Sequence, residues 1–328
     1  MRFTRARRLS LAAIGGLAVA LLAACTSSGS SNSATTASAH LEKTTVTVGA
    51  LPVVDSAGLY LAKQNGYFQQ AGLTVNIQPV AQSPLAIPEM KSGKIDVVAG
   101  ANYVSFFQAA EVKNLPVKLL VDGESCTDDT FEVLARPDSG INSPAALAHK
   151  TIAVNIKNNI QTMLTNTALQ AAGVNPASVT YKVVPFPLMG AALAHGQVDA
   201  ISVVEPFITE NELKVGAQPI MSTCTGPTAN FPISGFFALS SFTKKYPNTA
   251  RAFVAALQRG QALADSNRAD VEEILPSYIP KLTANQAAVV NLGQYPTNLD
   301  TTHLQRVADA MAKASLAPGF KVNSLLFH

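Results

Sequence analysis

Polar and aromatic side chains in this sequence gather in short segments that directly follow apolar stretches typical of strands. Carboxylates and amides bind small molecules through charge and hydrogen bonds, and an aromatic ring can stack on a flat ligand. The side chains of these segments are therefore the candidate ligand-binding residues. They are Asp55, Ser56, Asn102, Tyr103, Glu124, Lys157, Asn158, Glu205 and Phe207.

The charges of these candidates indicate the kind of ligand. Asp55, Glu124 and Glu205 are acidic, whereas Lys157 is the one cation among them. A small anion without a positive group would be repelled unless helix N-termini dominate the field. The balance favours a ligand with an amine or a protonatable nitrogen, such as an aminopyrimidine or an aminosulfonate, over nitrate.

Each candidate also has a structural interpretation. Asp55, Ser56 and Asn102 precede predicted helices and could act as N-caps. The two aromatic residues could belong to the core, and the lysine could be solvated. Glu205 follows an apolar strand and stands beside Pro206, so it could contact the ligand or have a surface or hinge role.

The sequence lacks the motifs of the common hydrolases and metal enzymes. No HExxH, GxxxxGK or GxSxG motif is present, so we expect no catalytic residue, no metal and no cofactor. The histidines are scattered and predict no metal site. They are His40, His149, His195, His303 and His328.

Short strands alternate with helices along most of the chain, which predicts α/β sheets with helices on both faces. Strands are expected at 45–50, 74–80, 95–99, 117–121, 131–136, 151–154, 200–203 and 233–240. Helices are expected at 57–70, 83–93, 103–112, 242–267, 270–278, 285–294 and 304–316. The segments 131–136 and 233–240 are expected to pass between two lobes.

The pattern of the first half returns about 100 residues later. Residues 47–51, 69–73 and 91–97 are echoed in the same order by 151–155, 170–174 and 194–200. In the third pair a helix ends on glycine, Gly93 or Gly196, which can supply a left-handed cap. Three matches in one order predict two similar lobes.

The N-terminus is typical of an export signal. Residues 1–24 hold four arginines and no acid, followed by an apolar run that ends in Leu22-Ala23-Ala24-Cys25. This ending resembles a bacterial lipobox, which implies cleavage before Cys25 and lipidation of Cys25, including palmitate. Residues 25–43 are rich in small polar side chains and are expected to form a flexible tether. An ordinary signal with a chance cysteine is the alternative, and the export route stays open between the general and twin-arginine pathways.

Removal of the signal changes the charge balance. Lys and Arg fall from 24 to 20 against 21 acidic residues, so no basic excess remains to bind nucleic acid. We expect the mature protein on the extracytoplasmic face of the cell membrane, held by its lipid. Cys126 and Cys224 form an even pair in an oxidising compartment, which favours a disulfide over two buried thiols.

The chain resembles the solute-binding proteins of bacterial ABC importers in the nitrate/sulfonate/taurine and thiamine-pyrimidine-precursor group. The similarity covers roughly residues 44–320. It rests on the segments AGLYLAKQNGYF (57–68), GLTV (72–75), GKIDV (93–97), GQVDA (196–200) and EPF (205–207).

The resemblance implies a two-lobed α/β fold of the type II periplasmic-binding-protein kind, with mixed, mostly parallel sheets. Lobe 1 would comprise residues 44–130 and 238–328, and lobe 2 residues 131–237. It further implies a small-molecule ligand in the cleft, closure on binding, and delivery to a permease powered by an ATPase. We expect a monomer. The alternative is an enzyme on the same fold, such as one that makes a pyrimidine precursor.

Overall fold

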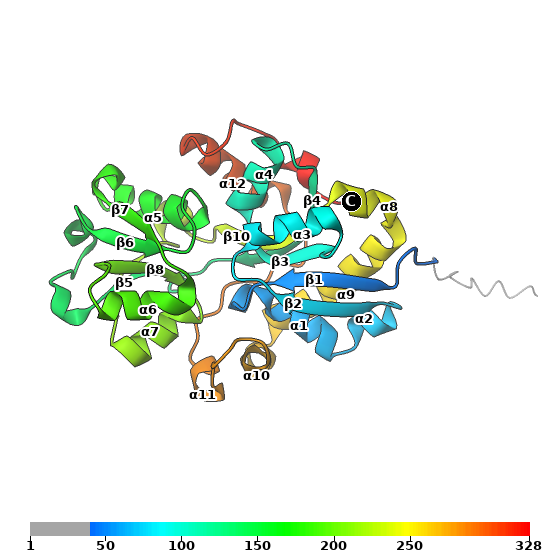
Figure 1. Ribbon diagram of the computed structural model, residues 1–328, viewed down its shortest axis with the longest axis horizontal. Helices are drawn as coiled ribbons and strands as arrows, with labels where there is room; N and C mark the ends of the chain where they lie inside the picture. The colour runs from blue at the N-terminus through cyan, green and yellow to red at the C-terminus, as the bar shows by residue number, and fades with distance from the viewer. Residues whose placement is uncertain (1–39) are drawn as a thin grey trace, which may run out of the picture. The chain divides into compact units, whose positions relative to one another are not determined.

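The computed structural model describes residues 40–328 (Figure 1). The expected export signal, Cys25 and residues 25–39 of the expected tether lie outside the described residues. The last residues of the expected tether pack on the folded body. Lys43 pairs with Asp96 at 2.6 Å, and Glu42 accepts a hydrogen bond from the backbone N–H of Thr249 at 3.0 Å.

Two five-stranded sheets organise the body (Figure 1). Their strand orders are β2-β1-β3-β10-β4 and β7-β6-β8-β5-β9. The first sheet comprises β1 (Thr45–Ala50), β2 (Thr74–Pro79), β3 (Val97–Asn102), β4 (Val117–Ser125) and β10 (Pro232–Leu239). The second comprises β5 (Phe131–Ala135), β6 (Thr151–Val154), β7 (Thr180–Val183), β8 (Ala200–Val204) and β9 (Gln218–Ser222).

The two sheets have equivalent strand arrangements and directions, and each carries flanking helices, which confirms the predicted two-lobed α/β fold. In each, β10 or β5 runs antiparallel to both neighbours, and the other four strands share one direction. The sheets are therefore mixed and mostly parallel in direction. Buried parallel strands read as continuous apolar runs, as the AISVV sequence of β8 does.

Helices flank both sheets, and their bounds differ from the prediction where glycine or proline interrupts the pattern. They are α1 (Ala57–Gln64), α2 (Tyr67–Gln70), α3 (Ile87–Ser92), α4 (Tyr103–Glu111), α5 (Ile160–Ala171), α6 (Phe186–Ala194), α7 (Phe207–Val215), α8 (Ser240–Lys245), α9 (Pro247–Ser266), α10 (Arg268–Ile274), α11 (Ala284–Ala287) and α12 (Thr301–Lys313).

Three differences have clear causes. The helix expected at 57–70 divides at Gly66, whose φ of 69° is left-handed. The helix expected at 242–267 divides before Pro247, which cannot donate a helical hydrogen bond. The helix expected at 285–294 is wrong beyond Ala287, because the backbone N–H groups of Asn291 and Gly293 instead bind buried carboxylates.

The chain crosses between the sheets twice, at 126–130 and 223–231. The segments expected to cross, 131–136 and 233–240, instead form β5 and β10 inside the sheets. The whole of β10 pairs in the first sheet, although the sequence assigned residues up to 237 to the second lobe. Cys126 and Cys224, one from each crossing, are joined by a disulfide with a Cα–Cα distance of 5.9 Å.

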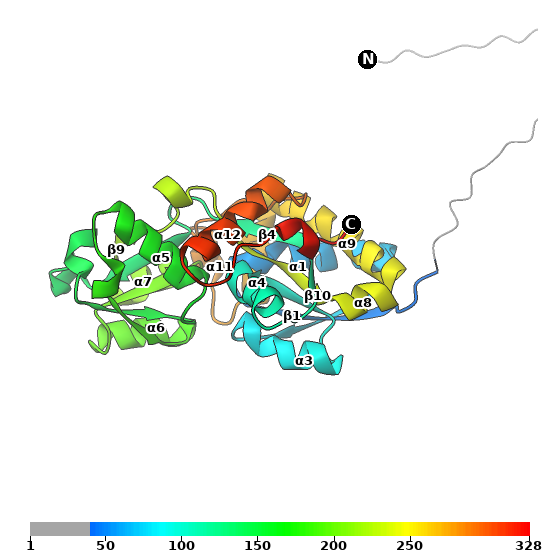
Figure 2. The ribbon, with the colours of Figure 1, turned by 90° about the horizontal axis from the view of Figure 1, so that it is seen from above.

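One buried apolar cluster extends through both halves of the body. It contains Phe107 and Phe237 beside the first sheet, and Leu164 and Ile201 beside the second. The C-terminal end lies against the first sheet (Figure 2), where Leu326 bridges Leu119 of β4. Among residues 40–328, no helix combines the length and apolar character needed to cross a bilayer.

Candidate functional site

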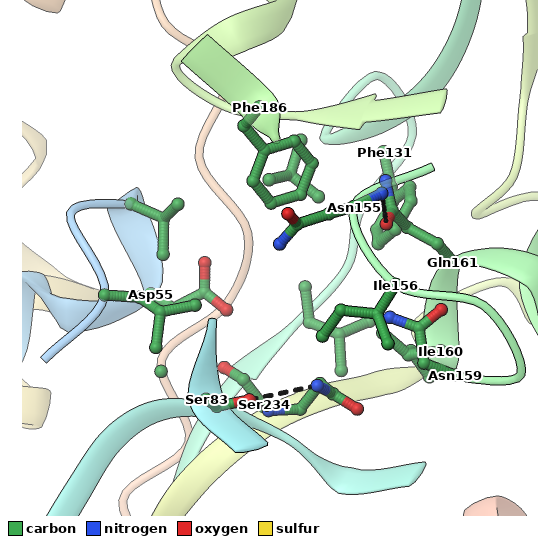
Figure 3. A pocket seen from close by; sticks show the side chains of 16 residues that line it. Asp55, Ser83, Phe131, Asn155, Ile156, Asn159, Ile160, Gln161, Phe186 and Ser234 are labelled. Carbon is green, nitrogen blue, oxygen red and sulfur yellow. Dashed lines mark hydrogen bonds between the residues drawn. The ribbon is translucent and has the colours of Figure 1, made fainter. Parts of the chain in front are cut away.

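A cavity of about 50 Å³ lies where loops of the two sheets face each other (Figure 3). Its sixteen lining residues lie in the loops after β1 and β6, at the carboxyl ends of β3 and β8, in β5 and β10, or in neighbouring helices. Ligands bind at such strand ends in open α/β sheets. The lining comprises Leu51, Val53, Asp55, Ser83, Gly100, Asn102, Phe131, Asn155, Ile156, Asn159, Ile160, Gln161, Phe186, Val204, Ile233 and Ser234.

The first lobe supplies a polar wall. The Asp55 carboxyl group points into the cavity (Figure 3) from the short 3-10 helix Val54–Ser56. Asn102 is the N-cap of α4, since its Oδ1 accepts from the backbone N–H of Ser105 at 2.8 Å. Its Nδ2 donates to Ser83 Oγ at 3.0 Å, so the Asn102 side chain also holds Ser83, another lining residue, in place.

The second lobe supplies amides and apolar side chains. The Asn155 side chain points towards the space in front of Asp55, with the Phe186 ring beside it (Figure 3). Gln161 holds the loop: its Oε1 accepts from the backbone N–H of Asn155 at 2.7 Å, and its Nε2 donates to the Ser202 carbonyl at 2.6 Å. Gln82 Nε2 donates to the Asn155 carbonyl at 3.0 Å, so the two walls are in contact.

Behind this wall, Asp55 and Glu124 form a buried pair of carboxyl groups. Their exposed fractions are 6% and 1%. Burial raises the pKa of both, and the Asp55 charge raises the pKa of Glu124 further. The hydrogen bond between them lowers the pKa of Asp55 and raises that of Glu124, as expected when protonated Glu124 donates to ionised Asp55. Glu124 Oε1 also accepts from the Gly293 backbone N–H at 2.9 Å.

Glu205 is fully buried and does not line the cavity. Its carboxyl group accepts from Thr209 Oγ1 at 2.9 Å and the Thr209 backbone N–H at 3.2 Å, both on α7. It also accepts from the Asn291 backbone N–H at 3.0 Å, which ties α7 to the segment after α11. Burial raises the pKa of Glu205 to about 7, although these three hydrogen bonds lower it.

The other predicted site residues are dispersed around the cavity. Ser56 Oγ donates to the Leu51 carbonyl at 2.8 Å, and Tyr103 Oη donates to Asp122 Oδ1 at 2.5 Å within the core. Lys157 and Asn158 are exposed. Phe207 stacks on Phe186 at a centroid distance of 5.1 Å and so supports the wall from behind. Asp55 and Asn102 are the predicted residues that line the cavity.

Several lining residues were not singled out from the sequence. Asn155 and Asn159 lie in the loop after β6, where Lys157 and Asn158 were chosen instead. In that loop the two ends are buried and the middle is exposed, which the sequence does not reveal because four of its five residues are polar. Phe186 opens α6 after Pro185, a signal that could have marked it. Ser83, Gln161 and Ser234 have no distinguishing sequence signal.

Replacement of Glu205 by Ala is expected to lower the free energy of unfolding by about 3 kcal/mol, because two buried donors of Thr209 and the half-buried N–H of Asn291 lose their acceptor. Urea unfolding at pH 6 measures this change. The matched control is Glu210→Ala, which removes an exposed ion pair with Lys214 (2.7 Å) and should cost at most about 0.5 kcal/mol. Equal effects of the two changes would contradict a structural role for Glu205.

Comparison with known proteins places this architecture in a family. A profile described as NMT1/THI5 like matches residues 53–268, more than half of the chain. The nitrate/nitrite binding protein NrtA of Nostoc sp. (strain PCC 7120 / SAG 25.82 / UTEX 2576) is 24% identical over 297 residues, with 79% of this chain and 66% of NrtA covered. The chain thus spans slightly less than two thirds of that curated relative.

Solved structures share the fold. The periplasmic aliphatic sulphonate binding protein SsuA from Escherichia coli superposes with a TM-score of 0.69 at 18% identity, covering 86% of this chain and 97% of SsuA. The desulfurization enzyme DSZB superposes with a TM-score of 0.63 at 16% identity, covering 86% and 96%. The fold is therefore one that both binding proteins and an enzyme use. The extent of the profile match shows that the chain belongs to the NMT1/THI5-like family.

Proposed function

We propose that this protein is an extracytoplasmic solute-binding lipoprotein that captures a small organic molecule between its two lobes for an ABC importer. The observation that carries the proposal is the cavity between equivalent strand ends of two equally built sheets, with side chains of both lobes in its wall. Relatives named as nitrate/nitrite and sulphonate binding proteins support it. The ligand class proposed is a nitrogen- or sulfonate-containing compound.

The wall composition supports a capture mechanism. Asp55 and Asn102 belong to the first lobe, whereas Asn155, Gln161 and Phe186 belong to the second. A ligand that touches both sets has its full contacts in the closed arrangement alone, so binding shifts the population towards closure. Asp55 and Asn102 are the proposed contacts from the first lobe, with Asn155 and Phe186 opposite. The closed protein would then dock on a permease driven by a separate ATPase, with Cys25 as the lipid anchor.

The cavity lining favours binding over turnover. It contains neither Cys nor His in the described part of the chain, so it offers no Cys–His or Ser–His pair of nucleophile and general base. Residues 40–328 also hold no group of three His, Cys, Asp or Glu side chains arranged for a metal ion. We therefore propose a binding protein, although DSZB shows that the fold can host an enzyme.

A thermal-shift screen followed by ligand recovery tests the proposal. The panel contains aminopyrimidines, alkanesulfonates, nitrate and polyamines. One class is expected to raise the melting temperature by mass action, to bind in a 1:1 ratio, and to be recovered chemically unchanged after hours of incubation. Conversion of the ligand by the protein would contradict the transport role and favour the enzyme.

A further inference from the structure

The charge of the cavity points to a narrower ligand class, an inference that rests on the proposed solute-binding role. Of the sixteen lining residues, all within the described part of the chain, none is Lys, Arg or His. Asp55 is the one ionisable side chain among them. An anion in this cavity would meet a buried carboxyl group with no basic side chain in the wall to compensate for it.

No cation elsewhere in residues 40–328 forms an ion pair with this carboxyl group. The four ion pairs of the described residues are Lys43–Asp96, Arg136–Asp138, Lys214–Glu210 and Arg268–Glu272, and none includes Asp55 or Glu124. The Arg268 guanidinium also donates to the Val290 carbonyl at 2.6 Å. A buried carboxylate without a cationic partner is costly, so a cation brought by a ligand would be strongly favoured.

The surroundings of the pair disfavour a second negative charge on it, because burial raises the pKa of both carboxyl groups and the Asp55 charge raises that of Glu124 further. Glu124 keeps its proton and donates a hydrogen bond to Asp55. The other ionisable groups that act on the pair are Glu205, Tyr278 and Tyr295. Burial keeps the pKa of both tyrosines well above the ordinary value, so they stay neutral. The Arg268 charge lowers the pKa of Tyr295, against these larger effects. The hydrogen bond from Glu124 favours Asp55, at the cavity wall, as the member of the pair that ionises.

A second acceptor lies in the same wall. Ser234 is 2% exposed, lines the cavity, and its Oγ has no hydrogen-bond partner of acceptable geometry. Its hydroxyl lies near enough to Asp55 to lower the pKa of that carboxyl group. An N–H donor from a ligand could reach this oxygen together with Asp55. The opposite wall is mainly apolar, with Ile156, Ile160 and Phe186.

We propose that the cavity binds a small organic monocation with at least two N–H donors, an amidine, guanidine or protonated amino-heterocycle, through Asp55 and Ser234. The cavity volume of about 50 Å³ sets the size of the cationic group. One water needs roughly 10–15 Å³, so about four non-hydrogen atoms fit in this conformation. A larger ligand would place its cationic end here and open the lobes further.

Three isosteric probes test charge at constant shape: acetamidine, acetamide and acetate, each with four non-hydrogen atoms. Nitrate and methanesulfonate are added as small anions. Dissociation constants are measured by NMR titration of the whole protein at pH 7. Acetamidine is expected to bind at least tenfold more tightly than acetamide, and the three anions more weakly still. When the pH is lowered below the pKa of Asp55, the affinity for acetamidine should fall by up to tenfold per pH unit, because binding requires the ionised carboxyl group.

Variants locate the interaction. Asp55→Asn should raise the dissociation constant of acetamidine at least tenfold and change that of acetamide less than threefold. Ser234→Ala should raise the dissociation constant of acetamidine about threefold. The control is Asp138→Asn, an exposed carboxyl group paired with Arg136, which should change nothing. If Asp55→Asn fails to fold, Ser234→Ala and the pH dependence of acetamidine binding still test the proposal.

The outcomes separate this inference from the proposed function. Tighter binding of an anion or of acetamide than of acetamidine would overturn the cation class and leave the solute-binding role standing. Acetamidine binding that is indifferent to Asp55→Asn would also overturn it. If none of these probes binds and the wider panel also fails, both the cation class and the solute-binding role are wrong.

Discussion

The Asp122→Asn variant is expected to be about 4 kcal/mol more stable to unfolding than the wild type at pH 8, and nearly equal to it at pH 4. Asp122 is 1% exposed. Its Oδ1 accepts from Tyr103 Oη and, at 3.0 Å, from the Gly123 backbone N–H, but its Oδ2 has no partner. Asparagine can keep both hydrogen bonds and replaces the unpartnered oxygen by a neutral group.

The pH dependence follows from the raised pKa of this carboxyl group. Burial raises the pKa of Asp122 to about 7 from an ordinary 3.8, against the hydrogen bonds from Tyr103 and Gly123. The folded state therefore binds this proton more tightly than the unfolded chain. The stability that this proton confers is complete below about pH 4 and is lost as the pH rises through 7. The neutral amide of the variant loses nothing over the same interval.

Urea unfolding at pH 4 and pH 8 measures the effect. Wild-type stability should fall between these values, with Glu205, whose pKa burial raises to about 7, contributing in the same direction. The control is again Asp138→Asn, whose exposed carboxyl group should leave both values unchanged. A stabilisation by Asp122→Asn that is the same at both pH values, or a loss of stability at pH 8, would show that this carboxyl group is not held protonated in the fold.

Removal of the Cys126–Cys224 disulfide, by replacing both residues with Ala, is expected to lower the free energy of unfolding by about 4 kcal/mol. The two cysteines are 98 residues apart, so the bond closes a long loop and reduces the entropy of the unfolded chain. The loop contains every strand of the second sheet. The bond also joins the two crossing segments, about which the lobes would move during closure.

Denaturant unfolding of the double variant, of the wild type, and of the wild type with dithiothreitol tests this expectation. The reduced wild type and the double variant should agree within about 1 kcal/mol, since Ala fills most of the space of a small buried side chain. A double variant as stable as the oxidised wild type would mean that the bond does not constrain the unfolded chain.

Local signals in the sequence located most strands correctly. β1 and β5 begin where the alternation of apolar and polar residues or a β-branched run predicts. β7 and β9 went unpredicted because their short segments are largely exposed and carry little apolar pattern. β4 was predicted to end at Val121 but continues to Ser125, because β10 pairs alongside it as far as Pro232. Strand ends depend on a partner that lies more than 100 residues away.

The candidate site was predicted less completely than the fold. The rule that ligands bind beyond strand ends predicts Asp55 and Asn102, and both line the cavity. The rule does not distinguish adjacent polar residues of one loop: it predicts Lys157 and Asn158, whereas Asn155 and Asn159 line the wall. Whether a loop side chain points inward depends on backbone torsions, such as the φ of 54° at Asn158, that the sequence does not display.

The order of the apolar runs and their repetition after about 100 residues predicted two similar α/β lobes, because the period of burial is a property of the local sequence. The tertiary structure alone decided that Asp55, Glu124 and Ser234 meet, since they come from three separate elements and share a buried environment. It also decided their chemistry, because the proton held between two carboxyl groups depends on their burial and separation, and neither is a property of the linear chain.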